Sequence, residues 1–322
     1  MNVKGMMRAI AIDRFGGPDT LTLKTLPIPE IGPDEVLVRL EFAGVGEWDP
    51  FELEGGYAKM MGMQPDFPFV LGSEGAGTVA AAGEQVRGLA PGDRVNAIGF
   101  LNPRGGLYAE YVAITADLVT PITGGMTAEQ AAVVGGVGLT ALRGLDDTLR
   151  IHPGESVMIF GAGGGIGHVA VQLAMRMGAR VLAVASGADG VALAERVGAD
   201  AVVDGRMGDV PAAARAFAPD GLDAALLTAG GQAAEAALRT LRPGGRAAYP
   251  NGVNPEPRAP EGIRLDAFNG DPDRDIIQRL NGLIDRGPFH VHVACTFPLE
   301  QAAKAHRALG EHYLGKLALR IG

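Results

Sequence analysis

The segment 156–178 places the strongest constraint on what this chain can fold into. The apolar run Ser156-Val-Met-Ile-Phe160 is typical of a buried strand, and Gly161-Ala-Gly-Gly-Gly-Ile-Gly167 follows it at once. A helix is predicted over 165–178. A strand that enters a helix through glycines presents bare backbone N–H groups and a helix N-terminus, which suit the pyrophosphate of a dinucleotide. In the usual pattern Gly-x-Gly-x-x-Gly, Ala162 takes the first place and Gly164 and Gly167 take the others.

Apolar strands alternate with Ala-rich helices around this turn. We predict strands at 156–160, 181–185, 201–203, 224–228 and 247–249, and helices at 165–178, 189–198, 210–217 and 232–241. Strands that are apolar along their whole length favour a parallel sheet covered by helices on both faces. The sequence therefore predicts a doubly wound α/β domain over 126–264, and Thr127 and Gln130 form a capping box at its first helix.

The two ends of the chain have a different character. Residues 7–122 contain short alternating segments separated by Gly and Pro turns, which favours an antiparallel β-rich domain. After the α/β segment we predict a helix at 272–286, a strand at 289–295, a helix at 299–309 and a strand at 316–321. The expected organisation is one β-rich domain built from 1–125 and 265–322, with the doubly wound domain inserted.

Charge and hydropathy exclude several classes of partner. The 322 residues carry a net charge of −9 and no basic run, which argues against nucleic-acid binding. No apolar run is long enough to span a membrane, and the N-terminal residues lack the apolar core of a signal peptide. We therefore expect a cytoplasmic protein.

Cysteine and histidine usage argues against a metal site. Cys295 is the single cysteine, so an intramolecular disulfide and a cysteine-rich metal site are excluded. Because its neighbours are apolar, we expect Cys295 to be buried. His290 and His292 share one face of a predicted strand, but no third ligand accompanies them.

The ends of the later strands suggest which dinucleotide binds. Where an acidic residue would bind the ribose of NAD, the sequence has Ser186 and Gly187. A carboxylate about 4 Å from a 2′-phosphate would cost about 4 kcal/mol at an effective dielectric constant of 20, so its absence leaves room for NADP. Ser186 and Arg206 are candidate phosphate ligands, although Asp189 lies nearby and NAD stays open. The expected cofactor contacts are Gly161, Ala162, Gly163, Gly164, Gly165, Ile166, Gly167, Ser186, Arg206, Ala229, Gly230 and Asn251.

Several motifs together resemble one family across nearly the whole chain. They are Pro68-Phe-Val-Leu-Gly-Ser-Glu-Gly-Ala-Gly77, Gly92-Asp-Arg-Val95, Gly106-Leu-Tyr-Ala-Glu-Tyr-Val112, Gly138-Leu-Thr-Ala141 and the glycine-rich turn. In this order they resemble the medium-chain dehydrogenase/reductase superfamily, and within it the zinc-independent quinone oxidoreductases. The resemblance implies a GroES-like catalytic domain, a Rossmann cofactor domain and a homodimer. The positions that match the catalytic zinc ligands of the superfamily's alcohol dehydrogenases look like Gly46, Ser73 and Val137, none of which suits zinc.

The resemblance implies hydride transfer from NADPH to a quinone or an α,β-unsaturated carbonyl, without zinc. It points to Tyr57, Asp49 and Thr140 as catalytic residues and to Trp48, Phe51 and Tyr108 as walls of the substrate pocket. Two alternatives stay open. One is an enoyl-thioester reductase, which the acidic charge does not favour. The other is a non-catalytic NADP(H)-binding sensor, which the intact glycine-rich turn does not favour.

Overall fold

The chain divides into two compact units, each with its own core. This computed structural model describes residues 3–123 and 125–322. The β-rich unit comprises Met1–Gly136, Pro272–Ile277 and Val293–Gly322, and the parallel-sheet unit comprises Val137–Asp271 and Gln278–His292. Residues 1, 2 and 124, which fall in the first predicted domain, lie outside the described residues. These units divide within helix α3 (Ala128–Leu142), between Gly136 and Val137, whereas the sequence analysis placed its domain boundaries at 125/126 and 264/265.

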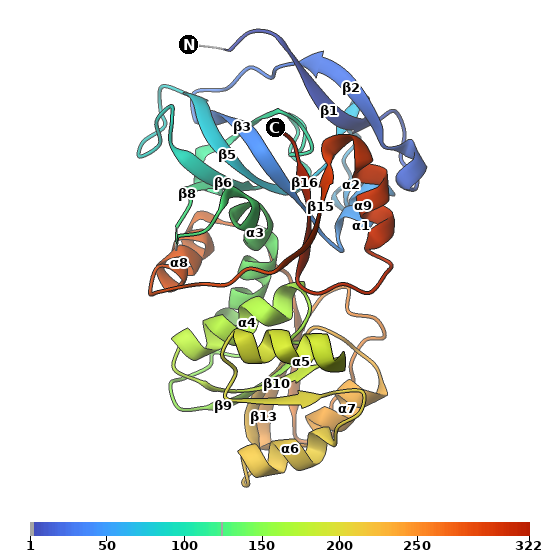
Figure 1. The fold of residues 1–322 in the computed structure, drawn as a ribbon, viewed down its shortest axis with the longest axis vertical. Coiled ribbons are helices and arrows are strands. Elements are labelled where there is room, and N and C mark those ends of the chain that lie inside the picture. The colour runs from blue at the N-terminus through green and yellow to red at the C-terminus, as the bar shows by residue number, and fades with distance from the viewer. Residues whose placement is uncertain (1–2, 124) are drawn as a thin grey trace. The chain divides into compact units, whose positions relative to one another are not determined.

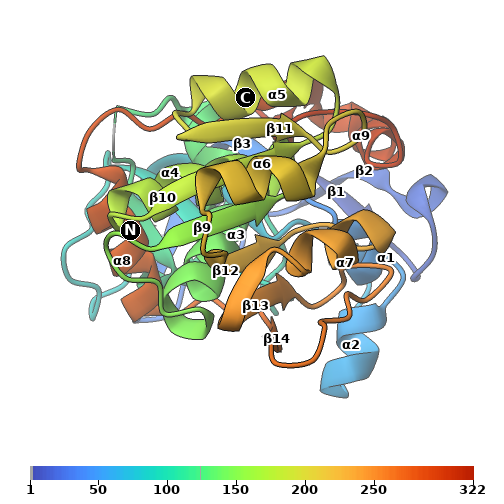
Figure 2. The same ribbon diagram turned by 90° about the horizontal axis from the view of Figure 1, so that it is seen from below.

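The parallel-sheet unit is built on one sheet with the strand order β11-β10-β9-β12-β13-β14 (Figure 2). Each neighbouring pair is parallel, for example with Val184 opposite Phe160. The chain runs outward from β9 on one side and then returns to add β12 on the other, so the strand order reverses between β9 and β12. Ligands of open α/β sheets bind at such a reversal. The strands are β9 (Ser156–Phe160), β10 (Arg180–Ala185), β11 (Ala201–Asp204), β12 (Leu222–Leu227), β13 (Leu241–Pro250) and β14 (Arg264–Phe268).

The predicted doubly wound fold is confirmed, with one strand added. Strand β14 was not expected, since Arg264-Leu-Asp-Ala-Phe268 lacks the apolar run of a central strand and lies at the sheet edge. The capping box is also present: the Thr127 N–H donates to Gln130 Oε1 (3.1 Å) and the Gln130 N–H to Thr127 Oγ1 (3.2 Å). The helices from α3 to α8 are α3, its π-helical continuation η3 (Arg143–Thr148), α4 (Gly165–Arg176), α5 (Gly187–Arg196), α6 (Val210–Phe217), α7 (Gln232–Leu238) and α8 (Arg274–Ile284).

The β-rich unit is organised around the long strand β3 (Glu35–Val45) (Figure 1). Its main sheet has the order β15-β16-β3-β5-β6-β8. Strand β7 pairs with residues 35–39 of β3, whereas β16 pairs with residues 42–45. A smaller sheet has the order β2-β1-β4. The other strands are β1 (Met6–Ile12), β2 (Thr22–Pro27), β4 (Phe69–Val70), β5 (Glu74–Ala82), β6 (Arg94–Ile98), β7 (Tyr111–Thr115), β8 (Val119–Pro121), β15 (Val293–Pro298) and β16 (Lys316–Arg320). The short helices are η1 (Pro18–Thr20), α1 (Asp49–Leu53), α2 (Gly56–Met61), η2 (Ala116–Leu118), η4 (Leu299–Gln301) and α9 (Ala302–Ala308).

Two sequence predictions about the last strands are wrong. The strand expected at 289–295 begins only at Val293, because the backbone at residues 290 and 292 bonds to side chains of α4. Cys295 is exposed, not buried. It lies on β15 at the edge of the main sheet, where apolar sequence neighbours do not ensure burial.

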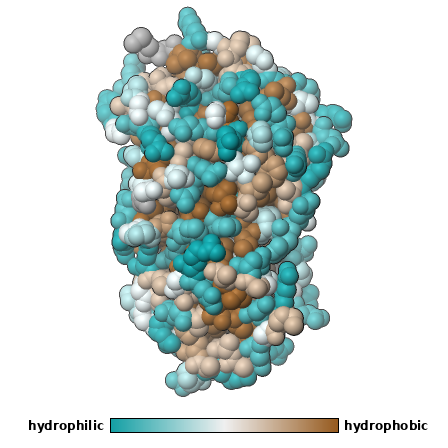
Figure 3. Space-filling view, in the orientation of Figure 1, coloured by the Kyte–Doolittle hydropathy of each residue, from teal (hydrophilic) through white to brown (hydrophobic). Residues whose placement is uncertain are grey.

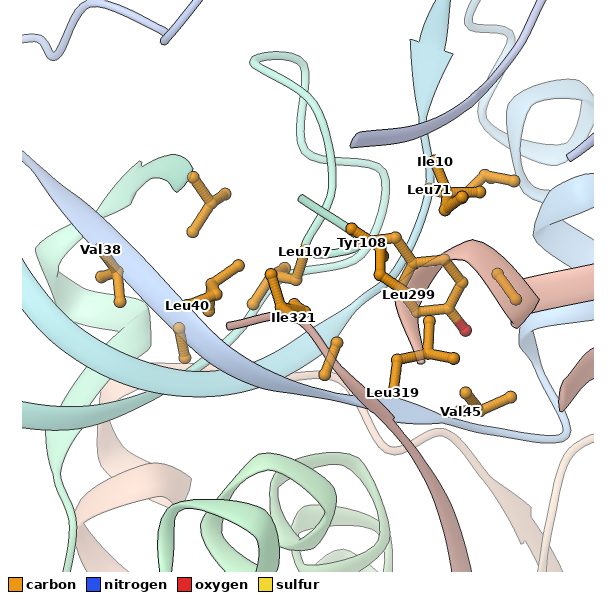
Figure 4. Packing of buried hydrophobic residues seen from close by; sticks show 14 of the residues in the cluster. Ile10, Val38, Leu40, Val45, Leu71, Leu107, Tyr108, Leu299, Leu319 and Ile321 are labelled. Carbon is orange, nitrogen blue, oxygen red and sulfur yellow. The ribbon is translucent and has the colours of Figure 1, made fainter. Parts of the chain in front are cut away.

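The core of the β-rich unit packs around Tyr108. Its ring is fully buried among aliphatic side chains that include Leu71, Leu107 and Leu299 (Figure 4). On the face shown in Figure 3, hydrophilic and hydrophobic residues are mixed. Among the described residues, no helix is long and apolar enough to cross a membrane.

Candidate functional site

The glycine-rich turn after β9 leaves the first turn of α4 uncovered. Gly161 has φ of +89°, and a Cβ there would lie 2.2 Å from Thr228 Oγ1. A Cβ on Gly167 would lie 2.1 Å from the Gly161 carbonyl oxygen. These two glycines are therefore required by the packing of the turn itself. Gly164 is the N-cap of α4, is exposed and places no side chain over the helix N-terminus. The leading N–H groups of α4 are suited to a phosphate anion.

The loops after β10 and β11 are tied together by Asp204. Its Oδ1 accepts the N–H of Gly187 (3.2 Å) and the N–H of Arg206 (2.9 Å). The hydrogen bond from the Arg206 N–H is the main cause that lowers the pKa of Asp204, so the carboxylate is ionised at neutral pH. Ser186 and Arg206 are exposed beside it, and the Arg206 Nη1 atom is 4.0 Å from the position of a Cβ on Gly187. The predicted phosphate ligands thus lie at neighbouring strand ends.

The remaining predicted cofactor residues also follow strands of the parallel sheet, at the carboxyl ends of those strands. Ala229 and Asn251 are exposed, and Asn251 Nδ2 donates to Asn269 Oδ1 (2.7 Å). A Cβ on Gly230 would lie 1.9 Å from the Pro255 carbonyl, so protein packing already explains that glycine. Thr140 lies beside the end of β14, since a Cβ on Gly270 would be 2.1 Å from its Oγ1.

A buried polar cluster in the β-rich unit centres on Asp49. Its carboxylate accepts from the Tyr108 hydroxyl (2.6 Å), the Gly46 N–H (2.8 Å) and the Ser73 hydroxyl (3.3 Å). Ser73 Oγ in turn accepts from Trp48 Nε1 (2.8 Å). Burial is the main cause that raises the pKa of Asp49, while these hydrogen bonds oppose the rise. Asp49 was expected to be catalytic and Tyr108 to line a pocket. In the structure both side chains are buried, and they are hydrogen-bonded to each other.

Two further buried acids adjoin this cluster. Glu52 lies one helical turn after Asp49, and its Oε2 accepts from the Gly72 N–H (3.4 Å). Burial and then the charge of Asp49 raise the pKa of Glu52 to about 8. Glu74 forms an ion pair with Lys316 Nζ (2.9 Å) and accepts the Gly136 N–H (2.8 Å). Lys316 Nζ also lies 4.3 Å from the centre of the Trp48 ring, a cation–π contact.

Aromatic side chains form a continuous array beside the cluster. Ring centres are 5.9 Å apart for Trp48 and Phe100, 6.2 Å for Phe100 and Tyr57, and 4.8 Å for Tyr57 and Phe51. Phe51 is 47% exposed and Met60 69% exposed, so one end of the array faces solvent. Three of the predicted site residues, Trp48, Phe51 and Tyr57, are therefore brought together. Phe100 was missed, since no local motif marks it.

The residues at the positions that resemble zinc ligands do not fit a metal. Gly46 has no side chain, and a Cβ there would lie 2.5 Å from the Trp48 ring. The Ser73 hydroxyl is already engaged with Trp48 and Asp49. Zinc in proteins takes thiolate, imidazole or carboxylate ligands. The carboxylate at this place, that of Asp49, is already engaged by Gly46, Ser73 and Tyr108, and the Trp48 indole fills the space beside Gly46.

Comparison with known proteins finds one matching family model for the β-rich part of the chain and one for the parallel-sheet part. Residues 32–124 match the family described as alcohol dehydrogenase GroES-like domain, and residues 165–259 match the family described as zinc-binding dehydrogenase. The quinone oxidoreductase of Rattus norvegicus is 30% identical over 329 residues, which cover 98% of this chain and 97% of that protein.

Solved structures are similar over the same extent. An NAD-dependent alcohol dehydrogenase is 29% identical, with a TM-score of 0.87, covering 98% of this chain and 100% of its own. A mycobacterial protein complexed with NADPH is 28% identical, with a TM-score of 0.79 and the same coverage of 98% and 100%. The chain belongs to the medium-chain dehydrogenase/reductase superfamily and is an oxidoreductase of its quinone oxidoreductase-like type.

Proposed function

We propose that this oxidoreductase reduces quinones or α,β-unsaturated carbonyl compounds with NADPH and without a metal. The observation that carries the proposal is the uncovered N-terminus of α4 at the reversal of strand order, in a chain similar to quinone oxidoreductases over its whole length. The similar mycobacterial protein complexed with NADPH supports the choice of dinucleotide. The exposed Arg206 beside Ser186 supports it independently, because a 2′-phosphate needs a cation and a hydrogen-bond donor.

The aromatic array supports a flat, conjugated acceptor. The rings of Trp48, Phe100 and Tyr57 offer apolar faces and edges that pack against another ring. Quinones and enones spread the developing negative charge over a conjugated system, so positioning and a hydrogen bond serve where a ketone would need a metal. We assign that hydrogen bond to the Tyr57 hydroxyl.

The roles of the residues follow from these placements. A bound reduced nicotinamide supplies the hydride, and the acceptor also gains one proton from water, which completes a two-electron reduction. The N–H groups at the start of α4 bind the pyrophosphate, and Ser186 and Arg206 bind the 2′-phosphate. Thr140, on α3 beside the end of β14, orients the nicotinamide side of the site.

The decisive assay is the oxidation of NADPH with a quinone, a simple enone and an enoyl thioester in parallel. We expect turnover with the first two and slower turnover with the thioester, because the acidic chain does not favour an anionic carrier. Tight NADPH binding with no turnover of any acceptor would instead support the non-catalytic alternative.

Two variants test the assigned residues. Tyr57→Phe should lower kcat/KM by about tenfold or more, the loss of one hydrogen bond to a developing oxyanion, while the matched Tyr111→Phe on β7 should not. Arg206→Gln should lower kcat/KM for NADPH and leave that for NADH unchanged, because NADH lacks the 2′-phosphate. Equal losses with both dinucleotides would contradict the role of Arg206.

A homodimer is part of the proposal. Strands β11 and β14 are the two edges of the described parallel sheet, and an unpaired edge can add a second copy. Light scattering of the purified chain should give twice the monomer mass, and a monomer would refute this part.

A further inference from the structure

Side chains on one face of α4 hold a segment of chain by hydrogen bonds to the backbone of that segment. His168, Gln172 and Arg176 follow one another at intervals of four residues, so they lie on the same side of the helix. Gln172 bonds the backbone of His290 in both directions, with Nε2 donating to the carbonyl and Oε1 accepting the N–H, each at 2.8 Å. Arg176 donates to the carbonyls of Ile284 (2.6 Å) and Gly287 (3.0 Å). We call residues 283–292 the strap.

His168 connects the strap to the glycine-rich turn. Its ring is completely buried, its Nδ1 lies 2.8 Å from the Gly164 carbonyl oxygen, and its Nε2 lies 3.2 Å from the backbone N of His292. His292 is the last residue of the parallel-sheet unit, and β15 of the other unit begins at Val293. One side chain therefore bonds to both the N-cap of α4 and the chain segment that leaves the unit.

The two partners fix the protonation of the ring. A carbonyl oxygen can only accept, so Nδ1 must carry the hydrogen, and a backbone N–H can only donate, so Nε2 must be bare. Burial is the main cause that lowers the pKa of His168 to about 4, in agreement with a neutral ring. Each ring nitrogen is satisfied in this one tautomer only.

The bond from the ring to Gly164 helps to hold the direction of an N–H group at the candidate site. The peptide group is planar, so the carbonyl of Gly164 and the N–H of Gly165 point in opposite directions. Gly165 is the first residue of α4. The Gly164 carbonyl accepts the His168 backbone N–H (3.1 Å), which begins the hydrogen bonding of α4, and also the hydrogen on the ring Nδ1. The ring therefore reinforces the orientation in which the Gly165 N–H points away from the helix, toward the place where a pyrophosphate would lie.

We propose that His168 is a positioning residue of the dinucleotide site, which fixes the leading N–H of α4 through Gly164 and ties it to the strap through His292. This inference rests on the proposed function, because it assumes that the turn binds a dinucleotide. Asparagine at this position keeps a donor for the Gly164 carbonyl but is too short to bond the strap as well.

Binding of NADPH is compared in the wild type, His168→Leu, His168→Asn and Gln172→Leu by titration calorimetry. His168→Leu should weaken NADPH binding by about tenfold, the value of one lost buried hydrogen bond, and His168→Asn should recover most of it. Gln172→Leu loosens the strap without touching the turn, so its affinity should stay within twofold. Binding of 2′-AMP, which has no pyrophosphate, should be the same in all four proteins.

Several outcomes would overturn the inference. Wild-type affinity in His168→Leu, or an equal loss in Gln172→Leu, would show that His168 acts only on stability. A wild type that binds neither NADPH nor NADH would refute the proposed function and this inference with it. If His168→Leu does not fold, ¹⁵N NMR of the wild-type imidazole decides: a bare Nε2 and an Nδ1–H whose exchange slows with NADPH support the role, and an Nε2–H refutes it.

Discussion

Replacement of Glu52 by glutamine tests how the buried acids of the β-rich unit affect stability. Glu52 is 2% exposed, and its pKa is raised from 4.5 to about 8, first by burial and then by Asp49. The unfolded chain therefore releases this proton near its ordinary pKa, whereas the folded chain keeps it up to about pH 8. Between these values the folded state binds more protons. The stabilisation is fully present below the unfolded pKa and is lost as pH rises through the folded pKa.

The size of the effect follows from the two pKa values. One pKa unit corresponds to about 1.4 kcal/mol, so between about pH 5.5 and pH 8 the contribution of Glu52 should fall by about 3 kcal/mol. Asp49 also has a raised pKa, so the titration belongs partly to the pair and the glutamine variant measures the coupled value. Buried histidines with lowered pKa add their own pH dependence, which cancels in the difference between the two proteins.

Denaturant unfolding followed by tryptophan fluorescence is the suitable assay. Trp48 is the single tryptophan and bonds to Ser73 in the same cluster, so its emission reports on this unit. The free energy of unfolding of Glu52→Gln, relative to the wild type, should rise steadily from pH 5.5 to 8. Glu54→Gln, at the exposed C-cap of the same helix, should run parallel to the wild type. A Glu52→Gln curve that also runs parallel to the wild type would refute the burial argument.

Three further results are expected. Gly167→Ala should lower the melting temperature and abolish NADPH binding, because the added Cβ would lie 2.1 Å from the Gly161 carbonyl oxygen. In the control Gly164→Ala the added Cβ would lie 3.4 Å from the same oxygen, so this variant should fold normally by circular dichroism. Tyr108→Phe should cost about 1–3 kcal/mol in denaturant unfolding, because Asp49 loses its shortest hydrogen bond in the interior. Cys295 is exposed and should react with a thiol reagent in the native protein at one equivalent per chain, whereas reaction only after unfolding would contradict its placement.

The parts of the fold that local patterns determine were predictable from the sequence. Strand β9 is buried along its whole length, and its apolar run predicts this directly. Strand β14 was missed because an edge strand needs no continuous apolar run. The strand expected at 289–295 began too early because Phe289, Val291 and Val293 alternate with polar residues as a strand would. The backbone of residues 290 and 292 instead bonds to Gln172 and His168, partners more than 100 residues away in sequence.

The placement of the candidate cofactor residues was predictable, because each follows a strand of the parallel sheet. The residues that support them were not. Asp204 and His168 act through hydrogen bonds to backbone groups of other segments, and no spacing within the chain records such a bond. The same limit applies to Asp49. Its motif was recognised, but its partner Tyr108 lies 59 residues away and is chosen by core packing alone.

The glycines around Trp48 show why a larger side chain at position 46 would not fit beside the ring. A Cβ at Gly46 would lie 2.5 Å from the indole, and one at Gly136 would lie 2.6 Å from it, both shorter than any ordinary contact. A ligand side chain at position 46 would therefore displace the ring, together with its hydrogen bond to Ser73 and its contact with the Lys316 ammonium. Because these contacts form one packed group, a single substitution at position 46 would disrupt the group before it created a metal site. Accommodating a ligand side chain at position 46 would therefore also require changes at Trp48 and at its neighbours Ser73 and Gly136.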